Sequence, residues 1–438
     1  MKFSKRKICM AVALAVSALG SAVPAMAGTI TGGGSSLIGP LMNSEIAAFG
    51  ANPDSLMYYG ISSGMGETAF LNDDASGLSS GAGGQLAFAN SDAAILSAYV
   101  SSYNSVDKAT DGPLIQIPYI VTPITVPYVN GPTSSTDTLQ GPQTTPGQTA
   151  SLALNEADLC GIYSGKMTNW YQVTNPDTNA TYTWNKAINV AYRSDNSGTT
   201  ELLTRHLSAV CPALAGSTVR ADGTTVTFAD SLAFTDSFPN HTVPANFIGE
   251  SGSGGIQSAL TTARSSASGP SVVGYLGPDW TNTFLAPLSS SASANLSVAS
   301  VRIATLNIDV APTFTDASHA VNASMTPVPE TSTAAADPTQ WVPNVANPTT
   351  GYPISGTSQI LLSQCYADPN VASTVVNFLT AHYQNASYQT IVHGNGFDTV
   401  PVSYLVEIDN VFLTNAHGFK LKIATGKTVG PCLSYVGR

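Results

Sequence analysis

The chain has 438 residues, of which 43% are hydrophobic and 10% charged, and its formal net charge is −11. This length is enough for two packed domains, and the apolar content excludes a disordered chain and predicts a globular one. The acidic balance argues against nucleic acid and an anionic membrane surface as partners, because both attract positive charge.

Residues 1–27 are typical of an export signal. Four basic residues precede an apolar stretch at 8–19, and Ala25-Met26-Ala27 offers a cleavage site between small residues. The stretch is too short to span a bilayer comfortably, so we expect no membrane insertion but a periplasmic or secreted protein that begins at Gly28. Of the 16 basic residues four lie in this segment, which leaves 12 against 27 acidic ones, a net charge of −15.

Four cysteines remain after this segment is removed. An even number in an exported chain favours two disulfides, and the least entangled pairing joins Cys160 to Cys211 and Cys365 to Cys432. A zinc site is less favoured, since no Cys-x-x-Cys pair or clustered histidine accompanies them. We therefore expect neither a metal ion nor another cofactor.

Two glycine-rich loops precede predicted helices in the first part of the chain. Residues 32–37 come before an apolar helical pattern that reaches Phe49, and Pro40 is tolerated in a first helical turn. Residues 60–66 follow a short apolar run and lead into a second helix. Such helix N-termini present free backbone N–H groups that can bind an anion. The alternative for each loop is an ordinary turn, because glycine and serine are common in turns.

The next segments alternate between strand-like and turn-like composition. Residues 85–89 and 114–128 are strand-like, and the segment 131–149 is predicted to be a surface loop. A second α/β stretch begins at 156–164, and its strand at 188–192 feeds the next loop.

The loop from Arg193 to Thr199 is typical of an oxyanion site. Ser197, Gly198 and Thr199 open a helix whose first N–H groups have no acceptor within the helix. Arg193 can offer a fork of N–H donors to tetrahedral oxygens, and Asp195 is close enough to orient it. The alternative is a capping serine beside a surface arginine.

After residue 250, some segments predict helices or strands clearly and others do not. Residues 251–255 form another glycine- and serine-rich stretch before a helical run, and residues 272–276 are strand-like. The segment 285–350 is rich in Ser, Ala, Thr and Pro and shows no clear element. A strand at 360–362 and a helix at 371–383 follow.

Seven stretches together resemble the DING proteins, a branch of the phosphate-binding proteins that serve bacterial phosphate ABC transporters. They are GGGSSL at 32–37, YYGISSGMGETAFL at 58–71, FANSDA at 88–93, GPLIQIP at 112–118, DLCGIYSGKMTNW at 158–170, NVAYRSDNSGTTELLTRHL at 189–207 and GYPISGTSQILLSQCYADP at 351–369.

The resemblance implies an α/β, two-lobed periplasmic-binding-protein fold of type II, with the ligand in the interdomain cleft. The expected division is 28–128 for the first part of lobe I, 129–350 for lobe II and 351–438 for the second part of lobe I. Hinge closure near Tyr128 and Gly351 would capture the ligand.

The resemblance also implies the ligand and its contacts. Inorganic phosphate is the expected ligand, a phosphate ABC transporter permease is the expected partner, and we expect a monomer. The positions carried over are Ser36, the backbone N–H of Leu37, Ser63, Asp92, Arg193, Ser197, Gly198 and Thr199.

Asp92 is an unusual member of this set, because a carboxylate repels most anions. Phosphate near neutral pH keeps a proton that an ionised Asp92 can accept, whereas sulfate has none and would leave a buried group unpaired. A site built on such a bond discriminates by about 10⁴ or more. The alternative is an ordinary turn residue after Asn90-Ser91.

Three other functions remain open. Residues 60–64 match the Gly-x-Ser-x-Gly pattern of serine hydrolases, although this pattern arises easily by chance in a glycine- and serine-rich chain. A secreted phosphomonoesterase is the main alternative, since low phosphatase activity is attributed to some DING proteins. A secreted adhesin would suit the Ser/Thr/Ala-rich region. We expect binding without catalysis.

Overall fold

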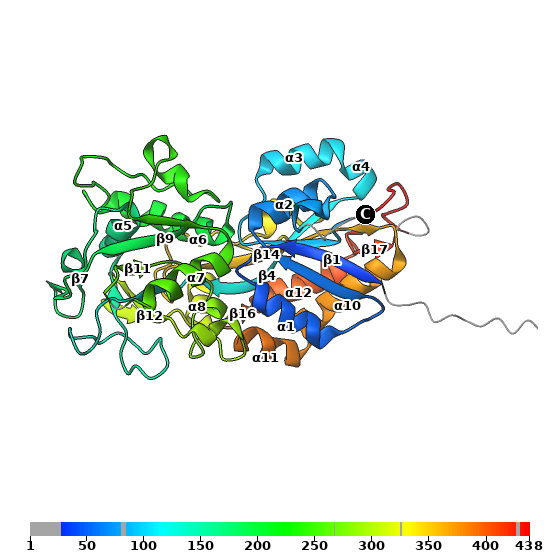
Figure 1. Ribbon diagram of the computed structural model, residues 1–438. Helices are drawn as coiled ribbons and strands as arrows, with labels where there is room; N and C mark the ends of the chain where they lie inside the picture. Colours follow the sequence, from blue (N-terminus) through cyan, green and yellow to red (C-terminus); the bar gives the residue numbers. More distant parts are fainter. Residues whose placement is uncertain (1–27, 80–84, 267, 325, 426–429) are drawn as a thin grey trace, which may run out of the picture.

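The structure is a computed structural model that describes residues 28–79, 85–266, 268–324, 326–425 and 430–438. The predicted export signal lies outside the described residues. Two β-sheets lie side by side, each with helices packed on it (Figure 1). We call each sheet with its helices a lobe.

The first lobe is built on a six-stranded mixed sheet with the order β16-β4-β14-β3-β1-β2. β1, β2 and β3 are parallel, whereas β14 runs antiparallel to β3 and β4. Its strands are β1 (Thr29–Gly34), β2 (Ser55–Gly60), β3 (Phe88–Ser91), β4 (Leu114–Pro123), β14 (Ser355–Ser363) and β16 (Asp398–Thr399).

The second lobe is built on a seven-stranded sheet with the order β10-β9-β11-β5-β12-β13, in which β6 also pairs with β12. Its strands are β5 (Val126–Val129), β6 (Ala153–Leu154), β9 (Ile188–Arg193), β10 (Phe247–Glu250), β11 (Ser271–Val273), β12 (Ser297–Ile303) and β13 (Ile308–Val310). Two small sheets pair β7 (Thr174–Asn175) with β8 (Ala180–Thr181) and β15 (Cys365–Tyr366) with β17 (Ala424–Thr425).

The α-helices follow the strands closely in the chain. They are α1 (Gly39–Phe49), α2 (Ser63–Leu71), α3 (Ser97–Val106), α4 (Lys108–Asp111), α5 (Glu156–Ser164), α6 (Gly198–Val210), α7 (Gly252–Arg264), α8 (Phe314–Ala323), α9 (Ser332–Ala335), α10 (Pro369–Gln384), α11 (Ala386–Gly394) and α12 (Val402–Ile408). Among the described residues no helix has the length and apolar character needed to cross a membrane.

Each of the two predicted glycine-rich loops joins a strand to a helix, β1 to α1 and β2 to α2. Gly34 is the last residue of β1, with a φ of +132°, and a Cβ there would lie 2.2 Å from the carbonyl oxygen of Asn90. Only glycine fits this close approach of β1 to β3. Pro40 lies in the first turn of α1, as expected, because a proline there loses no helical hydrogen bond.

The apolar run 114–128 contains two strands, not one. β4 lies in the first sheet and is buried along its whole length, β5 lies in the second sheet, and only Ile124 and Thr125 separate them. The N–H of Ile124 donates to Ile354 (2.7 Å), and that of Thr125 donates to Leu276 (2.9 Å). The chain therefore changes lobes at these two residues, slightly before the expected boundary after Tyr128.

The return to the first lobe also differs from the expectation. The second sheet ends with β13, and α8 already packs on β4, β14 and β16. Residues from α8 onward therefore lie on the first lobe, although the sequence placed the segment up to 350 in the second. Gly351, which was expected near a crossing between the lobes, thus lies within the first lobe, where its φ is +75° and a Cβ would lie 2.3 Å from the carbonyl oxygen of Asp316 in α8.

Two disulfides join Cys160 to Cys211 and Cys365 to Cys432, the pairing favoured by the sequence. The first links α5 to the end of α6 in the second lobe. The second links β15, which follows β14, to the C-terminal segment of the first lobe.

Candidate functional site

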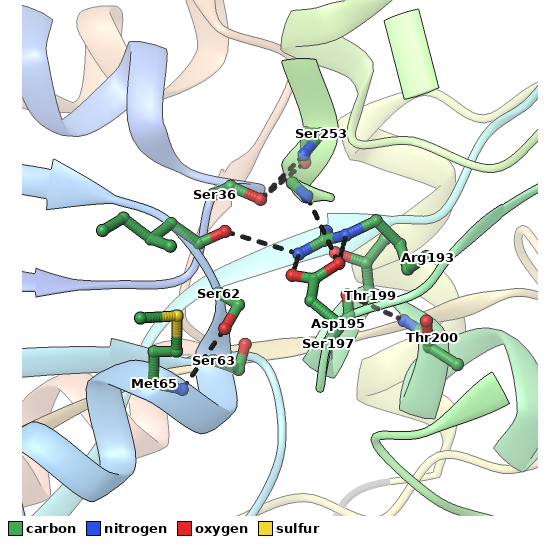
Figure 2. A network of polar contacts seen from close by, with 12 residues as sticks. Ser36, Ser62, Ser63, Met65, Arg193, Asp195, Ser197, Thr199, Thr200 and Ser253 are labelled. Carbon is green, nitrogen blue, oxygen red and sulfur yellow. Dashed lines mark hydrogen bonds and ion pairs between the residues drawn. The ribbon is translucent and has the colours of Figure 1, made fainter. Parts of the chain in front are cut away.

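The beginnings of four helices meet where the two lobes face each other (Figure 2). Ser36, in the loop before α1, lies 3.0 Å from the hydroxyl of Ser253 in α7 and accepts the Ser253 N–H at 2.9 Å. Ser63 opens α2 and accepts the backbone N–H of Asp92 at 3.3 Å, while Thr199 in α6 donates to the Asp92 carboxylate at 3.2 Å. Helix N-termini carry free N–H groups and a positive partial charge, so this meeting point favours an anion.

Two serines cap helices at this site. Ser62 caps α2 by accepting the N–H of Met65 at 3.2 Å, and Ser197 caps α6 by accepting that of Thr200 at 3.3 Å. The hydroxyl of Ser62, the central residue of the Gly-x-Ser-x-Gly match, thus serves as a helix cap.

Asp92 lies at the centre of the site, directly after β3, and its side chain is buried. Three hydroxyls donate to its carboxylate: Ser35 to Oδ2 at 2.8 Å, Thr199 to the same oxygen at 3.2 Å, and Ser358 to Oδ1 at 2.8 Å. Burial raises the pKa of Asp92 above its ordinary value, whereas these hydroxyls and the positive charge of Arg193 lower it. The hydroxyls thus favour an ionised carboxylate at a buried position.

Arg193 ends β9 beside Asp92 and is 2% exposed. Its Nε donates to Asp195 Oδ1 at 2.7 Å and its Nη2 to Asp195 Oδ2 at 2.5 Å, so Asp195 orients the guanidinium as expected. Asp195 Oδ1 also accepts the N–H of Gly252 at the start of α7 (3.2 Å). Since a guanidinium has five N–H donors, further donors stay available to an oxyanion.

Backbone groups and a glycine add to the side-chain contacts between the two lobes. Arg193 Nη2 reaches the carbonyl oxygen of Ile61 at 3.5 Å, and the N–H of Gly64 donates to the carbonyl of Asn196 at 3.0 Å. A Cβ on Gly198 would lie 2.7 Å from both Asp92 Cβ and Ser63 Oγ. A glycine at position 198 is therefore required for this close approach.

The structure brings all of the sequence-predicted residues to one place. Ser36, Ser63, Asp92, Arg193 and Thr199 lie in the contacts described above. The N–H of Leu37 donates to Ser35 Oγ at 3.1 Å. Every member is buried: Ser36, Leu37, Ser63, Asp92, Arg193, Ser197, Gly198 and Thr199. Their contacts with a ligand stay a prediction.

Sequence reasoning missed four further polar residues at the site. Ser35 and Ser358 donate to Asp92, Ser253 contacts Ser36, and the Tyr275 hydroxyl lies 2.8 Å from the N–H of Arg193 and 2.8 Å from Thr200 Oγ1. Ser253 had a signal, because residues 251–255 repeat the glycine- and serine-rich pattern before a helix. Ser358 and Tyr275 had no such sequence signal, because only the pairing of strands that are distant in the sequence brings them to the site.

Other acidic groups surround the carboxylate of Asp92. Glu67 in α2 accepts a 2.5 Å hydrogen bond from Ser91, and burial raises its pKa to about 8. Burial likewise raises the pKa of Glu201 in α6 to about 7, although Glu201 pairs with Arg205. Burial and the nearby Asp92 raise the pKa of Tyr58. In the part of the chain that the structure describes, no group of three or more His, Cys, Asp or Glu side chains is arranged to hold a metal ion.

A family model and two known proteins each match most of this chain. The family model described as a PBP superfamily domain matches residues 20–381. Alkaline phosphatase L of Pseudomonas aeruginosa is 31% identical over 425 residues, covering 97% of each chain. A phosphate-binding protein from an unknown prokaryotic organism is 28% identical over 409 residues, or 90% of this chain and 96% of that protein.

A solved structure extends the similarity to the fold. A high-affinity periplasmic phosphate-binding protein, PfluDING, solved bound with phosphate, has a TM-score of 0.70 and 29% sequence identity. The match covers 90% of this chain and 96% of that one.

Proposed function

Because this chain belongs to the PBP superfamily, and within it to the DING-type phosphate-binding proteins, we propose that it binds inorganic phosphate between its two lobes. One observation carries the proposal. A buried carboxylate, Asp92, receives three hydroxyl donors beside the Arg193 guanidinium, where four helix N-termini meet. The N–H groups of these helices and the Arg193 guanidinium can donate to an oxyanion, and the acceptor position that remains on Asp92 suits an oxyanion that still carries a proton.

Asp92 explains how the site would select phosphate. Near neutral pH phosphate keeps at least one proton, which an ionised carboxylate can accept while N–H and hydroxyl groups donate to the other oxygens. Sulfate presents only lone pairs to Asp92, and an unpaired buried group costs several kcal/mol. We therefore expect discrimination of about 10⁴ or more between the two anions.

The strength of such a site is sufficient for tight binding. Charge-assisted hydrogen bonds contribute about 1.5 to 3 kcal/mol each, so about ten of them exceed the roughly 8 kcal/mol of micromolar affinity. The excess offsets desolvation and the ordering of the two lobes. Lobe closure would occur around Ile124 and Thr125, where the chain changes sheets.

The proposed setting is outside the cytoplasm. The sequence of residues 1–27 predicts export, and the two disulfides suit an oxidising compartment. There the protein would act as a monomer that captures phosphate, either for a phosphate ABC transporter or for extracellular scavenging.

Two measurements test the proposal. Mass spectrometry of the native protein under non-denaturing conditions is expected to show orthophosphate bound to the chain. Calorimetry after exhaustive dialysis is expected to give a one-to-one phosphate complex and no heat of sulfate binding at the same concentrations. A protein that binds neither anion would overturn the proposal.

Phosphatase activity is the second candidate, favoured by the name of the Pseudomonas aeruginosa relative. A phosphate site of this kind could hold the phosphoryl group of a monoester while water attacks the phosphorus and the ester P–O bond breaks, which releases the alcohol and phosphate. The test is hydrolysis of p-nitrophenyl phosphate by rigorously purified protein. Activity that survives purification and is lost in Arg193→Ala would support an enzyme, whereas activity that the variant retains would point to a contaminant.

A further inference from the structure

Trp280 lies between the beginnings of α1 and α7, in the short 3₁₀ turn Pro278–Trp280. Its indole Nε1–H donates to the carbonyl oxygen of Ser36 at 2.9 Å. The ring faces a glycine on each helix, since a Cβ on Gly254 would lie 3.4 Å from it and one on Gly39 would lie 3.9 Å away. The indole therefore fits between a helix of the first lobe and a helix of the second.

The bond to Ser36 determines the direction of a neighbouring N–H group. In a trans peptide the carbonyl of one residue and the N–H of the next point in opposite directions. The Ser36 carbonyl faces Trp280, so the N–H of Leu37 faces the other way and donates to Ser35 Oγ at 3.1 Å. Ser35 in turn donates to Asp92 at 2.8 Å.

These bonds form one chain from the second lobe to the central carboxylate. It runs from the indole through the Ser36–Leu37 peptide and the Ser35 hydroxyl to Asp92. Successive hydrogen bonds polarise one another, so a donor at one end strengthens the donors beyond it. The indole thus acts on an N–H that faces the site without itself reaching the anion.

The position of the indole is determined by its own surroundings. Gln257 of α7 donates to the carbonyl oxygen of Trp280 at 2.6 Å. On the other side of the turn, a Cβ on Gly277 would lie 3.0 Å from the Leu37 side chain, so this segment approaches the loop before α1 closely. Trp280 is therefore held against the Ser36 carbonyl by two separate contacts of its segment.

We propose that Trp280 is a positioning residue of the anion site, which holds the Ser36–Leu37 peptide with its N–H toward the ligand and so strengthens phosphate binding. This inference rests on the proposed function. It concerns how the N–H of Leu37 is oriented, and it assigns Trp280 no direct contact with phosphate.

The test is Trp280→Phe, which keeps an aromatic ring and removes the donor. Loss of one hydrogen bond of about 1.4 kcal/mol predicts phosphate binding about 10-fold weaker by calorimetry. The matched control is Trp184→Phe. Trp184 is also partly buried and donates its indole N–H to a backbone carbonyl, that of Asn130 at 2.9 Å, but outside the site. The control is expected to bind phosphate as the wild type does.

A second measurement separates positioning from a merely structural role. With ¹⁵N-leucine labelling, the Leu37 amide signal is expected to shift on phosphate addition, and to shift less in Trp280→Phe. Gln257→Leu, which frees the Trp280 backbone and keeps the ring, is expected to weaken binding in the same direction.

The possible failures are distinguishable. A wild type that does not bind phosphate overturns the proposed function itself. The inference alone is overturned if the wild type binds and Trp280→Phe binds within about twofold of it, with the same Leu37 shift. It is also overturned if Trp184→Phe weakens binding as much as Trp280→Phe does.

Discussion

The hydroxyl of Ser35 donates to the carboxylate of Asp92 over 2.8 Å, although the two are 57 positions apart in the chain. Thr199 donates to the same oxygen and Ser358 to the other. A carboxylate accepts about four hydrogen bonds, so three hydroxyl donors leave about one position for a proton of the ligand. This arrangement underlies the first two predictions.

Asp92→Asn is expected to weaken phosphate binding by roughly 10- to 100-fold, because the amide replaces a charged acceptor worth about 1.5 to 3 kcal/mol. The same change is expected to improve sulfate binding, since the amide can donate a hydrogen bond to it. Calorimetry with both anions measures the two effects. Asp222→Asn, at an exposed position, is the control and is expected to change neither. Unchanged sulfate rejection in Asp92→Asn would contradict the role given to Asp92.

Ser35→Ala is expected to change how phosphate binding depends on pH. Burial raises the pKa of Asp92, and the Ser35 hydrogen bond lowers it, so removing the hydroxyl raises this pKa further. Asp92 then loses its charge at a higher pH on acidification. When affinities are measured from pH 5 to pH 8, the variant should lose phosphate binding on acidification at a higher pH than the wild type does. A parallel pH profile with uniformly weaker binding would show that Ser35 acts only through packing.

Arg193→Ala is expected to weaken phosphate binding by roughly 100-fold, because several charge-assisted hydrogen bonds are lost together. The chain offers a matched control in Arg220, which pairs with Asp222 two residues later, as Arg193 does with Asp195. Since the Arg220 pair is more exposed and lies outside the site, Arg220→Ala should bind phosphate normally. Equal losses in both variants would indicate a general effect of net charge.

Gly198→Ala is expected to weaken phosphate binding by roughly 5- to 100-fold. The added methyl group would lie 2.7 Å from Asp92 Cβ and 2.8 Å from the Asp92 backbone nitrogen, and relieving such overlap costs about 1 to 3 kcal/mol. The control is Gly77→Ala, where no atom lies within 4 Å of the added carbon. Calorimetry measures affinity, and thermal melts check that both variants fold. Normal affinity in Gly198→Ala would mean that the lobes need not approach this closely.

Glu67→Gln is expected to alter the pH dependence of stability. Burial raises the pKa of Glu67 from 4.5 to about 8, so the folded protein holds a proton that the unfolded chain releases above pH 4.5. The wild type therefore loses stability as pH rises from 4.5 to 8, by about 1.4 kcal/mol per unit from this group.

The neutral glutamine has no such loss. The free energies of unfolding of wild type and variant should thus diverge from pH 5 to pH 8, by up to about 4 kcal/mol in favour of the variant. Urea unfolding at several pH values provides the measurement. Parallel curves would place the pKa of Glu67 near its ordinary value.

The sequence predicts the site best where the relevant residues are neighbours in the chain. Arg193, Asp195 and the start of α6 lie within one loop, and helix capping and charge pairing act over such short distances. Ser35 and Ser358 reach Asp92 only because β1, β3 and β14 pair in one sheet. No local pattern shows that pairing, so their bonds to Asp92 could not be predicted, although Ser35 lies in the glycine-rich loop 32–37 that the sequence singles out.

In the fold too, the sequence predicts local structure better than it predicts contacts between distant segments. The strand-like stretch at 114–128, rich in Ile, Val and Pro, predicts strand structure correctly but does not show that the chain changes sheets at Ile124. α8 lies in the segment for which the sequence predicts no element. It buries Ala317, Ala320 and Val321 on one face, and packing against the first sheet rather than strong intrinsic preference stabilises it.

Each disulfide closes a loop inside a single lobe, and among the described cysteines none is shared between the two lobes. Neither disulfide therefore resists the lobe closure proposed above for anion binding. Reduction of the disulfides would therefore shorten the time that each lobe survives heat or proteases. It would not hinder the exchange of an anion between the site and the surroundings.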